Sequence, residues 1–287
     1  MNIYVNITLP HIPCFMATLD VLDVAGESQN DIDQTIYKLR LNESGQTIGF
    51  FKQDMLKENE APVDKDYCGS CYGARPQGTC CNTCEDVRNA YAEMSWSFTN
   101  PENIEQCNRQ HYTELINEQA SEGCLVYGYL SVNKVAGNFH IAPGKSSSEA
   151  RSHVHDLHDY TKIKGRDFTH TINSLAFGQK VSFKNPLDNV SKETDNSAVN
   201  YQYHIKVVST KYEYINGKNI DTNQYSVTEH EKKPTIFGPS GIPGLFFSYD
   251  ISPMLVIYTE TKKPFAHFLT DVCAVVGGVF TVAGLLD

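Results

Sequence analysis

Residues 201–228, YQYHIKVVSTKYEYINGKNIDTNQYSVT, hold the strongest β-strand pattern of this chain. Residues 201–214 are rich in tyrosine and β-branched side chains, which pack well in sheets. The dipeptide Asn216-Gly217 follows at once and predicts a type I′ hairpin turn. Residues 223–228 then fit the returning strand. The segment therefore indicates an antiparallel hairpin within a mainly β fold.

Further strand patterns occur toward both ends of the chain. Alternating apolar and polar residues, bounded by Gly, Pro and Asn turn signals, predict strands at residues 3–9, 17–24, 35–41, 124–132, 138–141, 245–251 and 255–259. About ten strands separated by turns are typical of a β-sandwich. A chain of 287 residues is long enough to bury one full core.

A cysteine-rich segment interrupts the strand pattern. Five cysteines fall in the run CGSCYGARPQGTCCNTC at residues 68–84. The cysteines of the whole segment are Cys68, Cys71, Cys80, Cys81, Cys84, Cys107 and Cys124. Thiols at this density form disulfide bonds, bind a metal or take part in disulfide exchange. The redox compartment decides among these outcomes.

The residues alone leave these three roles open. If Cys273 in the apolar tail is set aside, Cys14 completes a set of eight, which is compatible with four structural disulfides in an oxidising compartment. The pairs Cys68/Cys71 and Cys81/Cys84 could instead be exchange-active, although no βαβ setting surrounds them. The same four thiolates could hold zinc, although nine residues between the pairs is shorter than the common zinc-ribbon spacing.

The cysteine-rich segment also carries helix signals. Apolar residues at helical spacing predict an amphipathic helix over 85–98. An Asn-Pro start signal predicts a second helix over 102–119. We therefore expect a mostly α-helical insertion over residues 61–124, with Cys107 and Cys124 tying its far ends back.

Three features indicate the secretory pathway and a membrane. The first is the cysteine density. The second is a set of glycosylation acceptors at Asn6, Asn42 and Asn189. The third is an uncharged apolar run over residues 272–286, which contains a Gly-Gly pair and predicts the start of a truncated transmembrane helix over 265–287. Since the first residues lack a signal-peptide pattern, we expect a membrane anchor upstream of this sequence.

Composition and motifs argue against several functions. The formal charge of −10 argues against nucleic-acid binding. Nucleophile-elbow, Walker, dinucleotide-binding and HExxH motifs are absent from the sequence, so we predict neither an enzyme nor a cofactor. Asp20 and Asp23 flank strand residues and are expected to be surface charges.

A histidine-rich stretch is a candidate pH sensor. His153, His155 and His158 lie within six residues of one another, and histidine titrates between pH 5 and 8. A metal site or a solvated polar loop are the alternatives. His140 and His170 lie nearby in sequence and could enlarge the cluster.

Segments along nearly the whole chain, among them CCNTCEDVR at 80–88 and GNFHIAPGK at 137–145, resemble the endoplasmic reticulum–Golgi intermediate compartment protein 3 family. The resemblance implies a membrane protein with two spans, short cytosolic ends and one large lumenal β-sandwich. Residues 1–264 would form this lumenal domain, and residues 265–287 would start the second span. Members cycle between endoplasmic reticulum, intermediate compartment and cis-Golgi in COPII-coated vesicles.

The resemblance further implies a hetero-oligomer with a smaller paralogue, coat contacts through cytosolic ends absent here, and a role in selecting or retrieving cargo. We therefore expect a non-enzymatic cargo receptor subunit whose cysteine-rich insertion binds cargo. Tyr72, Tyr91 and Trp96 are candidate contacts because aromatic residues are enriched in interface hot spots. Core packing is the alternative for these side chains, above all for Trp96. The alternative function is a lumenal thiol-disulfide oxidoreductase that uses the CxxC pairs.

Overall fold

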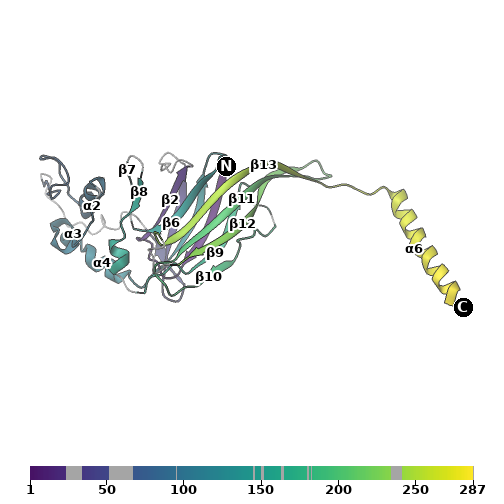
Figure 1. Ribbon diagram of the computed structural model, residues 1–287, viewed down its shortest axis with the longest axis horizontal. Helices are drawn as coiled ribbons and strands as arrows, with labels where there is room; N and C mark the ends of the chain where they lie inside the picture. Colours follow the sequence, from purple (N-terminus) through teal and green to yellow (C-terminus); the bar gives the residue numbers. More distant parts are fainter. Residues whose placement is uncertain are drawn as a thin grey trace.

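Two β-sheets packed face to face form the body of the molecule (Figure 1). The computed structural model describes residues 1–23, 34–51, 67–94, 96–144, 146–149, 152–162, 165–179, 181, 183–233 and 241–286. The expected mainly β sandwich with a helical cysteine-rich part is confirmed.

The first sheet has six strands in the order β10-β9-β1-β5-β3-β4. They are β1 (Asn2–Leu9), β3 (Gln34–Leu41), β4 (Thr47–Phe50), β5 (Gly123–Ser131), β9 (His170–Phe177) and β10 (Val190–Lys192). All of the neighbouring strands are antiparallel. Because β1 pairs with β5 over its whole length, the start of the chain lies beside the strand that follows the cysteine-rich segment.

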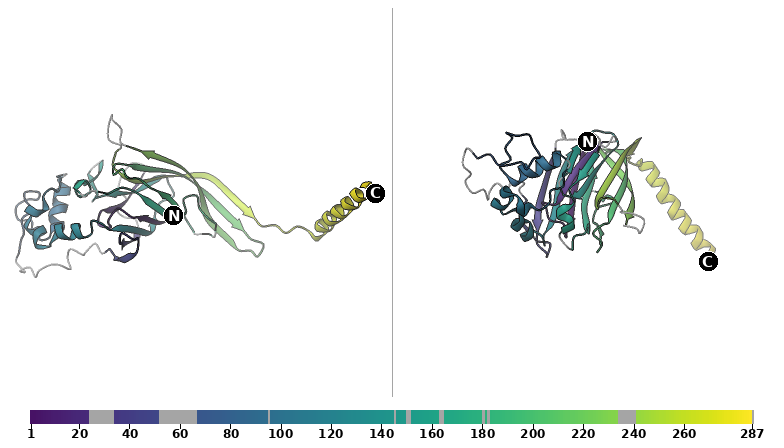
Figure 2. Two further views of the ribbon diagram at one scale, coloured as in Figure 1. Left: turned by 90° about the horizontal axis from the view of Figure 1, so that it is seen from below. Right: turned by 60° about the vertical axis from the view of Figure 1, so that its left-hand side comes forward.

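The second sheet has five strands in the order β12-β11-β13-β6-β2. They are β2 (Ala17–Asp23), β6 (Gly137–Pro143), β11 (Asn200–Glu213), β12 (Asn219–Lys232) and β13 (Gly244–Thr259). β11 and β12 form the predicted hairpin, and β13 runs parallel to β11. The ends of these three long strands extend past the rest of the sandwich (Figure 2).

The turn of this hairpin differs from the predicted type. The Tyr214 N–H donates to the carbonyl of Lys218 at 3.0 Å, which closes a loop around Gly217. Within the loop the positive φ of 78° falls on Gly217 and not on Asn216. A type I′ turn requires positive φ at both central residues, so that prediction was wrong although the hairpin itself is confirmed.

The core lies between the two sheets. Along β1, alternate side chains point inward and are buried, namely Ile3, Val5, Ile7 and Leu9. From the facing sheet, Phe139 of β6 stacks on Phe247 of β13 with 4.7 Å between ring centroids. Burying one such side chain stabilises the fold by about 1.5–3 kcal/mol. The two inner faces therefore supply a continuous apolar core that can carry attached elements.

The remaining elements lie at the two ends of the sandwich (Figures 1 and 2). Those at one end are α2 (Cys84–Glu93), η1 (Pro101–Asn103), α3 (Glu105–Arg109), α4 (Tyr112–Glu118), the hairpin β7 (Ser146–Glu149) and β8 (Ser152–His155), and α5 (His158–Lys162). At the other end, α6 (Phe265–Leu286) has 22 residues, and its most apolar 18-residue window has a mean hydropathy of 2.0. A helix of this length spans about 33 Å, which is enough to cross a bilayer core.

Several sequence predictions need correction. Residues 245–251 and 255–259 belong to one strand, β13, and the strands β4, β7, β8, β9 and β10 were missed. The first predicted helix ends at Glu93 rather than residue 98. The second is broken into η1, α3 and α4, because Ile104 is extended and His111 has a φ of 51°. Val24 lies outside the described residues.

Candidate functional site

The structure pairs eight of the nine cysteines. The bridges are Cys14–Cys124, Cys68–Cys80, Cys71–Cys81 and Cys84–Cys107, and Cys273 is free in α6. Three bridges lie within residues 67–122, which we call the lobe. The prediction that Cys124 ties the lobe back was wrong, since Cys124 lies in β5 and bonds to Cys14 within the sandwich core. Cys107, by contrast, does bring α3 to α2.

This pairing does not suit the two other roles considered for the cysteines. An exchange-active CxxC site bonds its two cysteines to each other. Here Cys68 and Cys71 bond to Cys80 and Cys81, and Cys84 bonds to a residue of α3. All four cysteines proposed for zinc are thus disulfide-bonded and offer no thiolate. The geometry therefore supports structural bridges.

Helix α2 begins at a capping box. The Thr83 hydroxyl accepts from the Asp86 N–H at 3.0 Å, and the Asp86 carboxylate accepts from the Thr83 N–H at 2.9 Å. Such reciprocal bonds satisfy two of the donors that a helix start leaves unpaired. The next residue is Cys84, so the cap and the Cys84–Cys107 bridge together fix where α2 starts.

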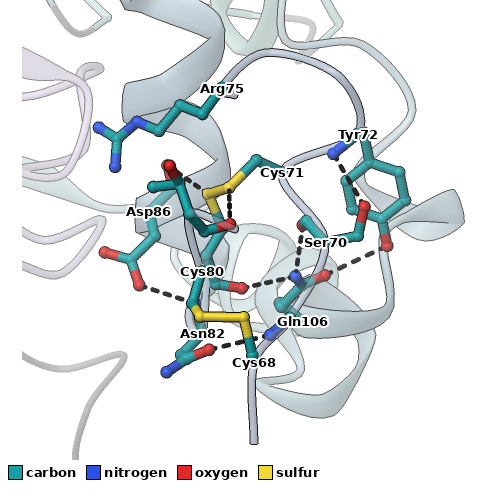
Figure 3. Close-up of a disulfide and its surroundings, with 12 residues drawn as sticks. Cys68, Ser70, Cys71, Tyr72, Arg75, Cys80, Asn82, Asp86 and Gln106 are labelled. Atoms are coloured by element: carbon teal, nitrogen blue, oxygen red, sulfur yellow. Dashed lines mark hydrogen bonds between the residues drawn. A yellow bond between two sulfur atoms is a disulfide. The ribbon is translucent and has the colours of Figure 1, made fainter. Parts of the chain in front are cut away.

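Gln106 joins the cysteine run to α3 (Figure 3). Its side-chain amide is buried and donates to the carbonyls of Ser70 at 2.8 Å and Cys81 at 2.7 Å. Its Oε1 accepts from the Tyr72 hydroxyl at 3.2 Å. Tyr72 has a left-handed φ of 52°, a strained conformation for a bulky residue. These hydrogen bonds hold the cysteine run on α3 and keep Tyr72 in that conformation.

Behind the bridges lies a small second core. It consists of Cys71, Ala74, Cys81, Cys84, Val87, Ala90, Phe98, Ile104, Cys107 and Tyr112. Phe98 meets Tyr112 edge-on at 6.1 Å between ring centroids. Ten buried side chains are a small core, so the lobe depends on its disulfides as small disulfide-rich domains do.

The three aromatic candidates differ in exposure, since Tyr72 and Trp96 are exposed whereas Tyr91 is half-buried and packs against the lobe core. Trp96 is 44% exposed and meets Tyr91 edge-on at 5.6 Å. Burial, and to a smaller extent Tyr72, raise the pKa of Tyr91. Met94, at the C-cap of α2, is 49% exposed. We call Tyr91, Met94 and Trp96 the tip; core packing of Trp96, the alternative considered above, is not what the structure shows.

The lobe contacts the rest of the molecule through a charged cluster. We call this cluster the seat, and it consists of Arg88, Tyr112, Asp156 and Asp159. Arg88 of α2 donates to the Tyr112 hydroxyl at 3.1 Å and lies 3.7 Å from Asp156 and 3.5 Å from Asp159. Burial opposes the Arg88 charge, but Tyr112 and the two carboxylates outweigh it and raise the Arg88 pKa. Burial is also the main cause that raises the Tyr112 pKa. Sequence patterns missed this seat, because its members are far apart along the chain.

The histidines whose side chains the structure describes do not form one cluster. His155 is buried against His140 and Asp20, with 3.1 Å between the two Nε2 atoms. His153 lies in β8 and His158 starts α5, but their side chains are outside what the structure describes. His170 lies elsewhere, in the sandwich core, where its ring nitrogens contact the Phe168 carbonyl and the Tyr203 hydroxyl. A sensor of three histidines stays a prediction, and only Asp20, His140 and His155 converge as possible metal ligands among the described residues.

The three glycosylation acceptors differ in exposure. Asn189 is exposed with a φ of 62°. Asn42 is half-buried, and its Oδ1 accepts from the N–H groups of Ser44 and Gln46 in a turn. Asn6 is half-buried and accepts from the Asn173 amide at 2.9 Å. Their modification stays a prediction, with Asn189 the most accessible.

A disulfide-bridged β-sandwich with a small helical lobe and a helix of membrane-spanning length defines the class of this molecule. The chain belongs to the endoplasmic reticulum vesicle transporter family, whose model matches residues 71–287. All of the chain aligns, at 47% identity, with 78% of the probable endoplasmic reticulum-Golgi intermediate compartment protein 3 of Dictyostelium discoideum. It also aligns, at 33% identity, with 80% of the ER-derived vesicles protein ERV46 of Saccharomyces cerevisiae.

A crystal structure of Erv41p aligns with 91% of the chain at a TM-score of 0.46 and 20% identity, a likeness too weak to support an argument. Family membership and the close relatives assign the chain to transport between endoplasmic reticulum and Golgi. The family resemblance read from the sequence is therefore confirmed.

Proposed function

We propose that this chain is a cargo receptor subunit whose lobe binds cargo in the lumen of the early secretory pathway. The four disulfides support a lumenal position, because such bonds persist in oxidising compartments. The helix α6 supports attachment to a membrane. The sandwich would hold the lobe, and the coat would be contacted by cytosolic segments outside this sequence.

The observation that carries the proposal is the exposed tip on a rigid support. Trp96 and Met94 are about half exposed, although α2 beneath them is fixed by a capping box and a disulfide. Aromatic residues dominate interface hot spots, and methionine adapts to differently shaped partners. A surface of this kind suits a receptor that must accept more than one client.

The smaller paralogue is the partner we expect for the sandwich. The outer face of the first sheet carries two cross-strand tyrosine pairs, Tyr4 with Tyr129 and Tyr37 with Tyr127. Tyr37 is about half exposed. Tyrosine is enriched at protein interfaces because it offers apolar area and a hydroxyl together. We propose this face of the sandwich, which is separate from the tip of the lobe, as the surface that pairs with the paralogue.

The test is client capture by the full protein in cells that lack their own copy. The double variant Met94→Ala/Trp96→Ala should lower the yield of crosslinked lumenal clients at least tenfold, since one hot-spot residue contributes about 2 kcal/mol or more. Ile215→Ala is the matched control, because Ile215 is 56% exposed in the loop between β11 and β12, outside both the tip and the outer face of the first sheet. Co-purification of the paralogue should be unchanged in both variants.

An unaltered client set in the double variant would refute the assignment of the tip. The oxidoreductase alternative is tested separately, by the reduction potentials of the bridges. Structural bridges have potentials below roughly −300 mV, whereas a catalytic pair would give about −180 mV. The cross-motif pairing of Cys68 and Cys71 favours the first value.

A further inference from the structure

Three side chains from three strands converge beneath the hairpin β7–β8. Asp20 comes from β2, His140 from β6 and His155 from β8. The two Nε2 atoms are 3.1 Å apart. The Asp20 Oδ2 lies 3.8 Å from Nε2 of His140 and 3.5 Å from Nε2 of His155. Asp20 and His140 are direct cross-strand partners, so the sheet itself fixes two of the three groups.

The contact between the two imidazoles is within hydrogen-bond distance, whereas both contacts of the carboxylate are longer. The two carboxylate–imidazole separations exceed the 2.7–3.2 Å of an N–H···O bond. Ligands around one metal ion, however, are held apart by the ion. A point in the plane of the three atoms lies about 2.0 Å from each of them, which matches zinc–nitrogen and zinc–oxygen bonds of about 2.0–2.2 Å. The three atoms therefore each lie about one zinc–ligand bond length from a common point.

The surroundings are those of a built site. The side chain of His155 is fully buried and that of His140 is almost so, while that of Asp20 is 12% exposed. The Ser146 hydroxyl of β7 donates to Asp20 Oδ1 at 2.7 Å, which leaves Oδ2 directed at the histidines. Phe246 stacks flat on the His140 ring at 5.0 Å. Neighbours that orient metal ligands in this way are a regular part of zinc sites.

Lys38 is a nearby cation that Asp20 attracts, so a metal ion at Asp20 would compete with its ammonium group.

We propose that Asp20, His140 and His155 form a Zn²⁺ site with one further position open to water or to another ligand. Two imidazoles favour zinc over calcium or magnesium, which prefer oxygen ligands. Three protein ligands with an open fourth position is an established arrangement for zinc.

The site ties the hairpin β7–β8 to the second sheet. Directly after His155, Asp156 lies beside Arg88 of the lobe seat. The Asp156 carbonyl also lies against Gly144, where an added Cβ would approach to 1.8 Å. A bound ion would thus fix, through one short segment, the support on which α2 rests.

The test is metal binding by the full, untagged chain in detergent, stripped with a chelator and reloaded. The wild type should retain about one zinc ion per chain, and Co²⁺ should give the visible absorption of a four-coordinate nitrogen and oxygen site. Asp20→Asn and His155→Gln should abolish both signals. Ser146→Ala should weaken affinity about tenfold, as expected for a group that orients a ligand. His204→Gln, an exposed histidine of β11, is the control and should bind as the wild type does.

Circular dichroism checks that each variant folds. If a ligand variant does not fold, X-ray absorption of the zinc-loaded wild type decides, because the proposal requires two imidazoles and oxygen around the ion. Zinc below stoichiometric level in the wild type, a shell without imidazole, or wild-type affinity in a folded Asp20→Asn variant would overturn it. Zinc addition should also slow amide exchange in residues 152–155 of the wild type and not of His155→Gln.

Discussion

The bridge between Cys84 and Cys107 should decide whether the lobe stays folded. It joins α2 to α3 with a sequence separation of 23. The chain-entropy model assigns a loop of this length about 3.4 kcal/mol. Cys84→Ala/Cys107→Ala removes the bridge without adding buried hydroxyls, which would cost more because both positions are buried. The lobe core has only ten buried residues, so this loss should open the lobe before the sandwich.

Hydrogen exchange on the full chain measures this opening. A loss of about 3.4 kcal/mol corresponds to roughly 300-fold faster exchange wherever lobe opening limits protection. We expect this acceleration in α2 and α3 and unchanged protection in β1 and β5. The two cysteines of the same bridge must be replaced together. A Cys81/Cys84 double variant would break two bridges and leave Cys71 and Cys107 unpaired.

Cys273→Ala is the matched control, because Cys273 is the free cysteine and lies in α6. It should leave lobe exchange as in the wild type. Unchanged exchange of α2 and α3 in the double variant would show that the bridge is not what holds the lobe. Equal acceleration in β1 and β5 would show that lobe and sandwich unfold as one unit, which would equally refute the reasoning.

Further expectations concern the seat, the core histidine and a glycine. Arg88→Met leaves Asp159 without its buried cation and should cost about 3 kcal/mol of unfolding free energy in urea titrations, whereas Arg75→Met, at an exposed ion pair with Glu93, should change little. His170 has a pKa lowered to about 4 by burial, with Tyr203, Lys192 and Glu229 around it, against about 6.5 when unfolded. Its contribution to stability is therefore complete above pH 6.5 and lost as the pH falls toward 4, so His170→Gln should make the fall shallower by up to about 1.4 kcal/mol per pH unit. Gly69→Ala should destabilise the lobe, because a Cβ would lie 2.3 Å from the Cys81 carbonyl oxygen, and faster exchange in α2 would measure it.

The strands could be predicted from the sequence because each carries a local signal. Alternation in residues 3–9 and the Asn-Gly signal near residue 216 depend only on neighbours in the chain. The turn type was wrong because a third loop residue shifts the positive φ onto Gly217. The break between α3 and α4 was missed because His111 adopts a left-handed φ that no Gly or Pro announces.

The candidate site was predictable only in outline. The sequence located the cysteines and the aromatic residues, but the spacing of eight cysteines does not determine their connectivity. Cys14 and Cys124 pair because the antiparallel register of β1 and β5 brings Cys124 opposite Leu9, near the loop that contains Cys14. Asp20 was expected to be a surface charge, yet the pairing of β2 with β6 turns it toward His140. Such contacts follow from tertiary register, which local patterns do not encode.

The arrangement of the lobe and α6 along the sandwich bears on which cargo the proposed receptor would bind. β13 has 16 residues, about 53 Å of extended chain, and pairs with β11 from Gly244 to Thr259. At its start, Phe246 lies opposite His140, near the hairpin that supports the lobe seat. Its other end leads into α6. The lobe lies at one end of the sandwich, and α6 lies beyond the other end (Figures 1 and 2). If the lobe binds cargo as proposed and α6 spans a membrane, a tip so placed should reach soluble clients more readily than the juxtamembrane parts of membrane proteins.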